Sequence, residues 1–244
     1  MTEFRLQGAP NFRDLGGYTT LHGRHIRRGK IFRSDHLGQL TADDVALLHN
    51  RLGATWRVID FRGVQERTTA PCNLPQAQVH ALSIEPTIVQ KLTDLLAQAQ
   101  EVSSAETVRL MQETYQGFVR HNTPRYADFF QHLLSETDHP LVFHCTAGKD
   151  RTGFAAALLL HALEVPTDVI WQDYLLTNER LKHRPMNSQL PAPIAHVLHA
   201  VQTEFLQAAL QTVDSEFGGL EPYLTQQLGL TPDARQRLRA LYLT

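Results

Sequence analysis

The sequence predicts an α/β fold in which a central, mostly parallel sheet is flanked by helices. Two observations predict this class. The apolar, β-prone run Leu141–His144 is followed by a short loop and then by residues 152–163, which are rich in strong helix formers. Earlier, a helical segment over residues 41–52 leads into the β-prone run Thr55–Phe61. Alternation of strand and helix segments is typical of parallel strands joined by helical crossovers.

The remaining elements follow from local signals. Thr41-Ala-Asp-Asp44 is typical of a capping box that begins a helix, and Gly53 is a suitable stop for it. The Gly- and Arg-rich residues 11–35 predict a small β element that ends in a strand over 30–33. Further helices are expected near 86–100, 104–120, 124–135, 167–178, 194–214 and 231–243.

Residues 84–136 predict a long helical insertion, more than a plain crossover between strands requires. Part of it is interpreted as a lid or substrate wall over the site. For the segment around Tyr115, Phe118 and Arg120, that role and simple packing into the core both stay open. No repeat or linker is evident, so residues 1–244 are expected to form one domain.

The segment His144-Cys-Thr-Ala-Gly-Lys-Asp-Arg-Thr-Gly153 carries the chemistry. It places Cys145 and Arg151 at the two ends of a loop that connects a strand to a helix. Amide groups and the dipole at a helix N-terminus favour an anion, and these surroundings also favour the thiolate form of a cysteine. The planar guanidinium of Arg151 matches two phosphoryl oxygens, which lysine cannot reproduce. The loop therefore predicts a cysteinyl-phosphate intermediate.

Other residues of this loop have supporting roles. Gly148 allows the backbone to turn its amides inward, Thr152 can donate its hydroxyl to the thiolate, and His144 is expected to hold the loop. The residues expected to bind phosphate are Thr146, Ala147, Gly148, Lys149 and Thr152. A lone cysteine is often an inert buried thiol. The joint pattern of His, Cys, a five-residue gap, Arg, Thr and Gly favours the reactive interpretation.

The sequence His-Cys-x5-Arg-Thr-Gly resembles the signature loop of cysteine-dependent protein tyrosine phosphatases. The inner residues Ala-Gly-Lys-Asp are similar to those of the atypical bacterial protein tyrosine phosphatases with phosphoinositide-phosphatase-like loops. Further segments that fit this branch are Asn11–Tyr18, Phe32–Asp35, Val58–Arg62 with Glu66-Arg67, Tyr174–Asn178 and Tyr223–Leu230. The resemblance covers nearly the whole chain and implies a three-layer cysteine-phosphatase-like fold with a helical lid.

The general acid is the open part of the mechanism, because the sequence lacks the Trp-Pro-Asp tripeptide that many tyrosine phosphatases use. Asp150 is the preferred candidate for protonating the leaving oxygen and then activating water. Its alternative role is to cap the following helix. Asp60 is the second candidate and Asp35 the third. Both could instead form ion pairs with an arginine: Arg33, Arg62 or Arg151.

Several substrates and activities stay open. Lys149 is a second cation that suits a phosphoinositide head group, but it could serve any phosphate monoester or face solvent. Hydrolysis of phosphotyrosine in proteins is preferred, with a phosphoinositide or multi-specific phosphatase as the alternative. A phosphate-binding module without turnover is a remote alternative. An arsenate reductase or sulfurtransferase is disfavoured by the His that precedes Cys145 and by the five-residue gap.

Composition excludes some partners. A net charge of −2 provides no basic field suited to nucleic acid or anionic lipid. The basic cluster over residues 24–30 is interpreted as a solvated hairpin face rather than a membrane contact. The apolar run 154–163 is too short to span a bilayer, and residues 1–8 lack a signal-peptide pattern. The histidines show no metal-ligand spacing, so no metal or other cofactor is expected.

The two cysteines, Cys72 and Cys145, make no disulfide framework and fit a reducing compartment. A cytoplasmic location is therefore expected, with export by another route left open. Cys72 could act as a resolving cysteine that forms a disulfide with an oxidised Cys145. A packing thiol is the preferred interpretation of Cys72.

Overall fold

The computed structural model describes residues 5–72, 74–75, 77–85, 88, 95, 102–135, 139–185 and 190–244. These residues contain a sheet with the strand order β1-β2-β5-β3-β4. Its strands are β1 (Arg13–Asp14), β2 (Ile31–Ser34), β3 (Trp56–Asp60), β4 (Ala77–Ala81) and β5 (Leu141–His144). β1 is antiparallel to β2, whereas the other neighbouring pairs are parallel. The predicted mostly parallel sheet is confirmed, with β2 one residue later than expected.

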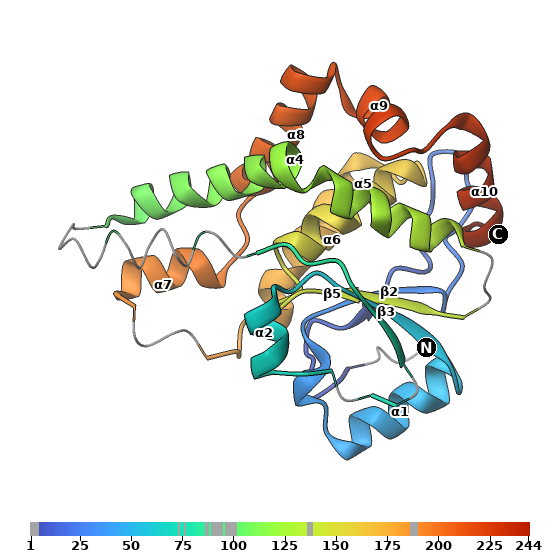
Figure 1. The fold of residues 1–244 in the computed structure, drawn as a ribbon, viewed down its shortest axis with the longest axis horizontal. Coiled ribbons are helices and arrows are strands. Elements are labelled where there is room, and N and C mark those ends of the chain that lie inside the picture. The colour runs from blue at the N-terminus through green and yellow to red at the C-terminus, as the bar shows by residue number, and fades with distance from the viewer. Residues whose placement is uncertain are drawn as a thin grey trace.

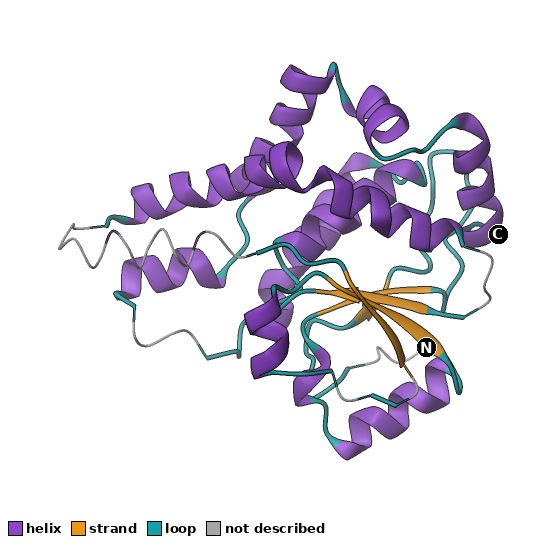
Figure 2. Cartoon of the chain, in the orientation of Figure 1, coloured by secondary structure: helices purple, strands orange, loops and turns teal. Residues whose placement is uncertain are grey.

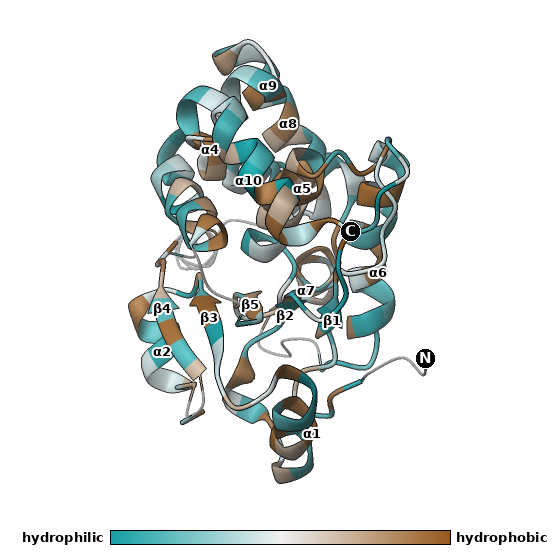
Figure 3. Cartoon of the chain, turned by 90° about the vertical axis from the view of Figure 1, so that its right-hand side faces the viewer, coloured by the Kyte–Doolittle hydropathy of each residue, from teal (hydrophilic) through white to brown (hydrophobic). Residues whose placement is uncertain are grey.

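Helices cover both faces of this sheet (Figures 1 and 2). They are α1 (Ala42–Leu52), α2 (Val64–Thr69), α4 (Ser104–Leu134), α5 (Arg151–Ala162), α6 (Thr167–Leu181), α7 (Ala192–His199), α8 (Thr203–Phe217), α9 (Leu220–Pro222) and α10 (Pro232–Tyr242). Short helical turns also occur at Leu37–Gln39 and Tyr223–Gln227. In Figure 3 the strands cross the middle of the molecule, with α1 below them and α4, α5, α8 and α10 above.

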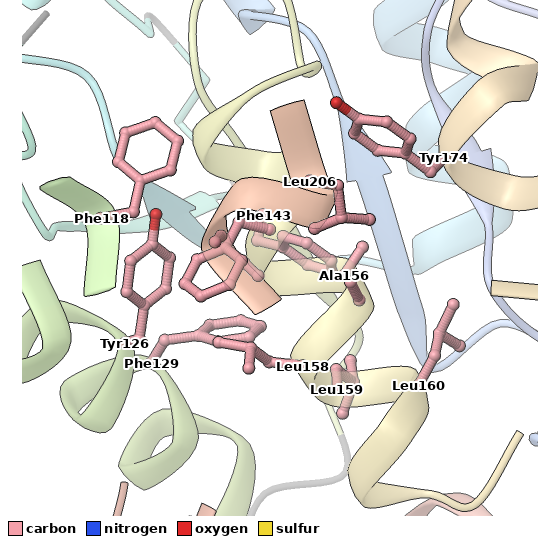
Figure 4. Packing of buried hydrophobic residues seen from close by; sticks show 14 of the residues in the cluster. Phe118, Tyr126, Phe129, Phe143, Ala156, Leu158, Leu159, Leu160, Tyr174 and Leu206 are labelled. Carbon is pink, nitrogen blue, oxygen red and sulfur yellow. The ribbon is translucent and has the colours of Figure 1, made fainter. Parts of the chain in front are cut away.

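The alternation of side chains along the strands supplies both faces of the sheet with apolar residues. Ile31, Ile59 and Phe143 pack into the larger cluster, together with the helices above the sheet. Their neighbours Phe32 and Val142 pack into a second cluster on the side of α1. Aromatic side chains of α4 meet the apolar face of α5 in the larger cluster, as Figure 4 shows. Strands buried on both faces are expected of a parallel sheet between helical layers.

The predicted capping box at Thr41 is confirmed. The Thr41 side chain accepts a hydrogen bond from the Asp44 amide, and Asp44 accepts one from the Thr41 amide in return. The same carboxylate also accepts the amides of Gln7 and Gly8 at 2.8 Å, so it anchors the N-terminal segment as well. Gly53 follows the helix with a φ of 82° and ends it, as expected.

Helix is confirmed over 104–120 and 124–134, but the predicted break between the two helices is wrong, because α4 continues through Pro124 as one helix. Proline removes a helical hydrogen bond and disfavours the preceding turn. Phe118 and Val119 before the proline, and Tyr126 and Phe129 after it, are all buried in the larger cluster. Burial of both halves in one core outweighs the local signal for a break. The two halves of α4 meet at an angle in Figure 1.

The single helix predicted over 194–214 is also wrong, since the chain leaves α7 at His199 and begins α8 at Thr203. The Asn178 side chain donates to the Val201 carbonyl at 2.9 Å and accepts the Val201 amide at 2.8 Å. This contact with α6 holds the break in extended form. The helices expected at 167–178 and 231–243 are confirmed, whereas the pattern at 86–100 lies almost wholly outside the described residues.

The basic cluster over residues 24–30 lies against the C-terminal residues of the chain. Arg24 donates to the main-chain carbonyls of Thr244 and Leu243, and Arg27 also donates to Leu243. Two arginines of this cluster therefore bind the last two residues of the sequence. In the part of the chain that the structure describes, no helix combines the length and apolar character needed to cross a membrane.

Candidate active site

The carboxyl ends of three neighbouring strands form the base of the site. Ser34 of β2 and Asp60 of β3 are both in register with His144 of β5. The residues that follow these positions, Asp35 and Cys145 among them, therefore emerge at one edge of the sheet. This edge, beyond the carboxyl ends of the strands, is where open α/β sheets bind ligands.

The four carbonyl groups from Cys145 to Gly148, in the loop after β5, are bound on its outer side. The Cys145 carbonyl lies 3.0 Å from Nδ1 of His144, and the Thr146 carbonyl accepts the His36 amide at 3.2 Å. Asn11 Nδ2 donates to the Ala147 and Gly148 carbonyls at 2.9 and 3.0 Å. Because the C=O and N–H of a trans peptide point in opposite directions, this arrangement turns the loop amides toward its interior.

Those amides form an anion cradle. Among the described residues, no backbone amide from Thr146 to Asp150 meets a protein acceptor. Gly148 makes the turn with a φ of 64°, and a Cβ there would lie 2.2 Å from the Ser34 carbonyl oxygen. Only glycine therefore fits this point of the loop. A concave run of free amides before a helix is suited to a phosphate group.

Arg151, the first residue of α5, closes the cradle. Its guanidinium forms a two-point pair with Glu66 of α2, at 2.7 and 2.9 Å, and it donates to the Ile84 carbonyl at 2.8 Å. Glu66 also accepts the Thr146 hydroxyl and the Gly63 amide. Burial opposes the charge on Glu66, but the bonds from Arg151 lower its pKa to about 2. The pair holds the arginine fork in one orientation.

A buried ionic network supports the loop from behind. Asp173 of α6 accepts hydrogen bonds from Arg13 at 2.8 Å and from Arg33 at 2.6 Å. Arg33 also donates to the Gly148 carbonyl at 2.8 Å, and Arg13 donates to the Asn11 side-chain oxygen at 2.6 Å. Thus two arginines and Asn11 connect α6 to the loop carbonyls.

Asp150 does not cap α5, because its side chain makes no bond to the first turn of that helix. Its carboxylate instead accepts the Tyr115 hydroxyl at 3.0 Å and lies 2.7 Å from Nζ of Lys149. Lys149 is buried, so the alternative in which it faces solvent is wrong. The Asp150 side chain is 23% exposed, in contrast to the buried Asp60. It is thus in a position to meet a ligand.

Asp60 and Arg62 form a fully buried pair with contacts of 2.8 to 3.1 Å. Burial opposes ionisation of Asp60, but His144 and Arg62 lower its pKa. Asp35 accepts the Asn11 amide at 3.1 Å, and burial raises its pKa to about 7. The sequence offered three arginines as ion-pair partners of Asp60 and Asp35: Arg33, Arg62 and Arg151. Of these three, only Arg62 pairs with one of the two carboxylates, Asp60. Arg33 pairs with Asp173, and Arg151 pairs with Glu66.

Cys145 and Thr152 lie at the two ends of the loop segment, Cys145 directly after β5 and Thr152 in α5. Cys145 is 2% exposed at the base of the loop. The Thr152 hydroxyl, in the first turn of α5, has no hydrogen-bond partner among the described residues. Cys72 packs at the edge of the second apolar cluster, where burial raises the pKa of its thiol to about 11. This environment favours the packing interpretation of Cys72.

The sequence interpretation assigned no role to Glu66, Asp173 or Asn11, although it quoted the segments that contain Glu66 and Asn11. Asp173 has a detectable signal. Ile170, Asp173, Tyr174 and Thr177 have the spacing of one helix face, and all four are buried. A carboxylate among residues of a buried face requires a partner.

Across the described ranges, no group of three or more His, Cys, Asp or Glu side chains could hold a metal ion.

Comparison with known proteins decides the family. The model of the tyrosine phosphatase family matches residues 4–244. The chain belongs to the tyrosine phosphatase family. This tyrosine phosphatase is 32% identical over 243 residues to a Cupriavidus necator protein named among the tyrosine-protein phosphatases, covering 96% of this chain and 85% of that protein.

The same tyrosine phosphatase is 30% identical over 277 residues to the triple specificity protein phosphatase PtpB of Mycobacterium tuberculosis, with 98% of each chain covered. Among solved structures, it matches the core catalytic domain of the PP-IP phosphatase SIW14 from S. cerevisiae at 13% identity, over 86% of this chain and 95% of that chain, with a TM-score of 0.36. Membership of this family makes the chain a phosphoric monoester hydrolase.

Proposed function

We propose that this tyrosine phosphatase hydrolyses phosphotyrosine in proteins through a cysteinyl-phosphate intermediate on Cys145. The observation that carries the proposal is the loop between β5 and α5. Its carbonyls are bound on the outside, its amides face inward, and Arg151 stands at its end with its fork held by Glu66. This is the arrangement that an oxyanion-stabilising site for phosphoryl transfer requires.

The first step transfers the phosphoryl group to sulfur. The Cys145 thiolate attacks phosphorus in line, an S–P bond forms, and the bond from phosphorus to the phenolic oxygen breaks. Protonated Asp150 gives its proton to the departing oxygen. The loop amides hold the equatorial oxygens together with Nε and the second N–H of Nη2 of Arg151, the donors that its bonds to Glu66 and Ile84 leave for the phosphoryl group. The unpartnered Thr152 hydroxyl is available to the sulfur. Water then attacks phosphorus, Asp150 takes its proton, and the S–P bond breaks to release phosphate.

The surroundings of the two carboxylates support Asp150 over Asp60 as the acid. Asp60 is fully buried beneath the loop and is bound on both oxygens by Arg62, which favours a permanent carboxylate. Asp150 is also paired, with Lys149 and Tyr115, but it lies in the loop itself and its side chain is 23% exposed, so it can exchange a proton with substrate and with water. Asp35 faces Asn11 and also lies at the buried base.

A wider substrate range is the second candidate, and one observation favours it. A relative that aligns over nearly the whole chain is named for triple specificity. Lys149 is the residue that would contribute to binding of a further phosphate. Its ammonium is already paired with Asp150, so binding of a second anion there competes with that contact. For this reason we place phosphotyrosine first and phosphoinositides second.

The test is hydrolysis of an aryl phosphate in the presence of EDTA by the wild type, Cys145→Ser and the control Cys72→Ser. We expect metal-independent turnover that is lost in Cys145→Ser and kept in Cys72→Ser. Arg151→Lys should also lose most activity, because lysine lacks the fork. Wild-type turnover by Cys145→Ser would contradict the covalent mechanism. A wild type that binds phosphate without turnover would indicate the binding-module alternative.

Substrate and acid are tested with the same proteins. Rates on a phosphotyrosine peptide and on soluble phosphoinositides give the preference between the two candidates. Asp150→Asn should slow substrates with poor leaving groups by about 10²-fold or more, and activated ones much less. Asp60→Asn is the comparison variant. If the dependence on the leaving group appears in Asp60→Asn instead, the acid is Asp60.

A further inference from the structure

The carboxylate of Asp150 is held by a pair of buried tyrosines from helices far apart in the sequence. Tyr115 comes from α4 and Tyr174 from α6, and they are 0% and 1% exposed. The Tyr115 hydroxyl donates to Oδ1 of Asp150 at 3.0 Å. The two phenolic oxygens lie 2.8 Å apart, and the Tyr174 hydroxyl also lies 3.4 Å from the Gln202 carbonyl. The contacts form a chain that ends on Asp150.

The direction of this chain follows from counting protons. Each phenol has one O–H donor. The proton of Tyr115 is directed to Asp150, so Tyr115 accepts in its 2.8 Å contact with Tyr174. The single Tyr174 proton is then directed to Tyr115 and away from the more distant Gln202 carbonyl at 3.4 Å. A donor that itself accepts a hydrogen bond is polarised and becomes a better donor. The pair therefore presents one strong, neutral donor to a single oxygen of Asp150.

Both phenols stay neutral over the ordinary pH range. Burial and the nearby Asp150 charge raise the pKa of Tyr115 well above its usual value, and the same two causes raise the pKa of Tyr174. The charged and titratable groups around the carboxylate are Lys149 and Arg151 of the loop segment, Tyr115 and Tyr126 of α4, and Tyr174 of α6, beside which Glu204 lies.

The rings are fixed by their packing. Tyr115 lies 5.1 Å from Phe118 and 5.9 Å from Phe205 between ring centroids. Tyr174 lies against Gly153 of α5, where a Cβ would come within 3.0 Å of its ring. The glycine that ends the His-Cys-x5-Arg-Thr-Gly segment thus makes room for this tyrosine. Figure 4 shows Tyr174 at the edge of the same core as Phe118.

We propose that Tyr115 and Tyr174 are positioning residues that hold the Asp150 carboxyl in the orientation required for proton transfer. The inference rests on the proposed role of Asp150 as acid and base. It also assigns α4 a role in orienting the acid, through Tyr115. This role differs from the two that the sequence left open for this segment, a lid and packing into the core. Tyr115 donates to Oδ1 of Asp150, and Nζ of Lys149 lies 2.7 Å from Oδ1 and from Oδ2. Oδ2, which Tyr115 does not bind, is then the oxygen that exchanges a proton, beside the Lys149 ammonium.

The test compares Tyr115→Phe, Tyr174→Phe and Asp150→Asn on two aryl phosphates, one with a poor and one with an activated leaving group. Tyr115→Phe should slow the poor leaving group by about tenfold and the activated one by less than about twofold. Tyr174→Phe should show a smaller effect of the same kind. Tyr242→Phe is the matched control, since its buried hydroxyl donates to the Leu133 carbonyl, away from Asp150.

A pH profile separates positioning from a structural role. Without the Tyr115 donor the carboxylate is less stabilised, so the alkaline limb of kcat on the poor leaving group should move to higher pH. Combining Tyr115→Phe with Asp150→Asn should add no further dependence on the leaving group. Equal slowing of both substrates by Tyr115→Phe, or an unmoved limb, would overturn the proposal.

The two assignments fail in different ways. Asp150→Asn with a strong dependence on the leaving group, next to Tyr115→Phe with none, would overturn the tyrosine proposal alone. An Asp150→Asn variant that slows both substrates equally would overturn the role of Asp150 and the tyrosine proposal together. Thermal unfolding of each variant identifies loss of fold. If Tyr115→Phe does not fold, the same criteria apply to Tyr174→Phe.

Discussion

Arg33 and Asp173 form a fully buried ion pair, with Nη1 of the arginine 2.6 Å from Oδ2 of the aspartate. The other terminal nitrogen of Arg33 donates to the Gly148 carbonyl in the phosphate loop at 2.8 Å. The pair therefore connects the middle of α6 to the part of the loop that requires glycine. The geometry of the cradle depends on a contact between β2 and α6 as much as on the loop's own sequence.

Asp173→Asn should destabilise the protein by about 3–5 kcal/mol, because two buried arginines, Arg13 and Arg33, lose their common counter-charge. The measurement is urea unfolding. Glu216→Gln is the control, since Glu216 pairs with Arg120 on the exposed surface and should cost less than about 1 kcal/mol. Similar losses in the two variants would contradict the importance of the buried network.

Glu66→Gln should lower stability most at neutral pH. The Glu66 pKa is depressed to about 2, so its contribution is fully present above the ordinary value of 4.5 and is lost as pH falls through about 2. The difference in unfolding free energy between wild type and variant should shrink by about 2 kcal/mol between pH 7 and pH 3. A difference that is constant with pH would exclude the assigned ion pair.

Gly148→Ala should disrupt both the fold of the loop and phosphate binding. The new Cβ would meet the Ser34 carbonyl at 2.2 Å, in addition to the strain of a positive φ. Gly29→Ala is the matched control, with a φ of 75° and no atom within 4 Å of the new Cβ. The control should cost about 1–2 kcal/mol in urea unfolding and keep its activity. Gly148→Ala should cost more and lower kcat by about 10²-fold; equal effects would refute the steric argument.

Asp35 and His36 should give opposite dependences of stability on pH. Burial raises the Asp35 pKa to about 7, so wild-type stability falls as pH rises from about 4 to 7. Burial also lowers the His36 pKa to about 4, so stability rises with pH up to about 6.5. In the wild type the two effects offset each other.

The two single variants separate these effects. Relative to wild type, Asp35→Asn should gain on the order of 2 kcal/mol in unfolding free energy between pH 4.5 and pH 7. His36→Asn should gain a similar amount as pH falls from 7 to 4.5. Urea unfolding at both pH values measures the changes. Differences from wild type that do not vary with pH would show that neither group titrates as assigned.

Local patterns along the chain suffice to predict the α/β class, the capped helix α1 and the loop that carries Cys145 and Arg151. These features rest on local signals: periodic apolar residues, a capping box, and a strand–loop–helix segment whose residues lie next to one another in the chain. The observed register of β2, β5 and β3 in the parallel sheet then brings Asp35, Asp60 and Cys145 to one edge.

The side chains that hold the site in place are paired by the folded chain, and these pairings could not be identified from local sequence. Glu66 meets Arg151 across 85 residues, Arg33 meets Asp173 across 140, and Tyr115 meets Asp150 across 35. The continuous α4 and the break before α8 are also decided at this level, by burial around Pro124 and by the Asn178 side chain. Hydrogen bonds and packing between distant segments leave no periodic or local pattern, because their partners are chosen by the fold.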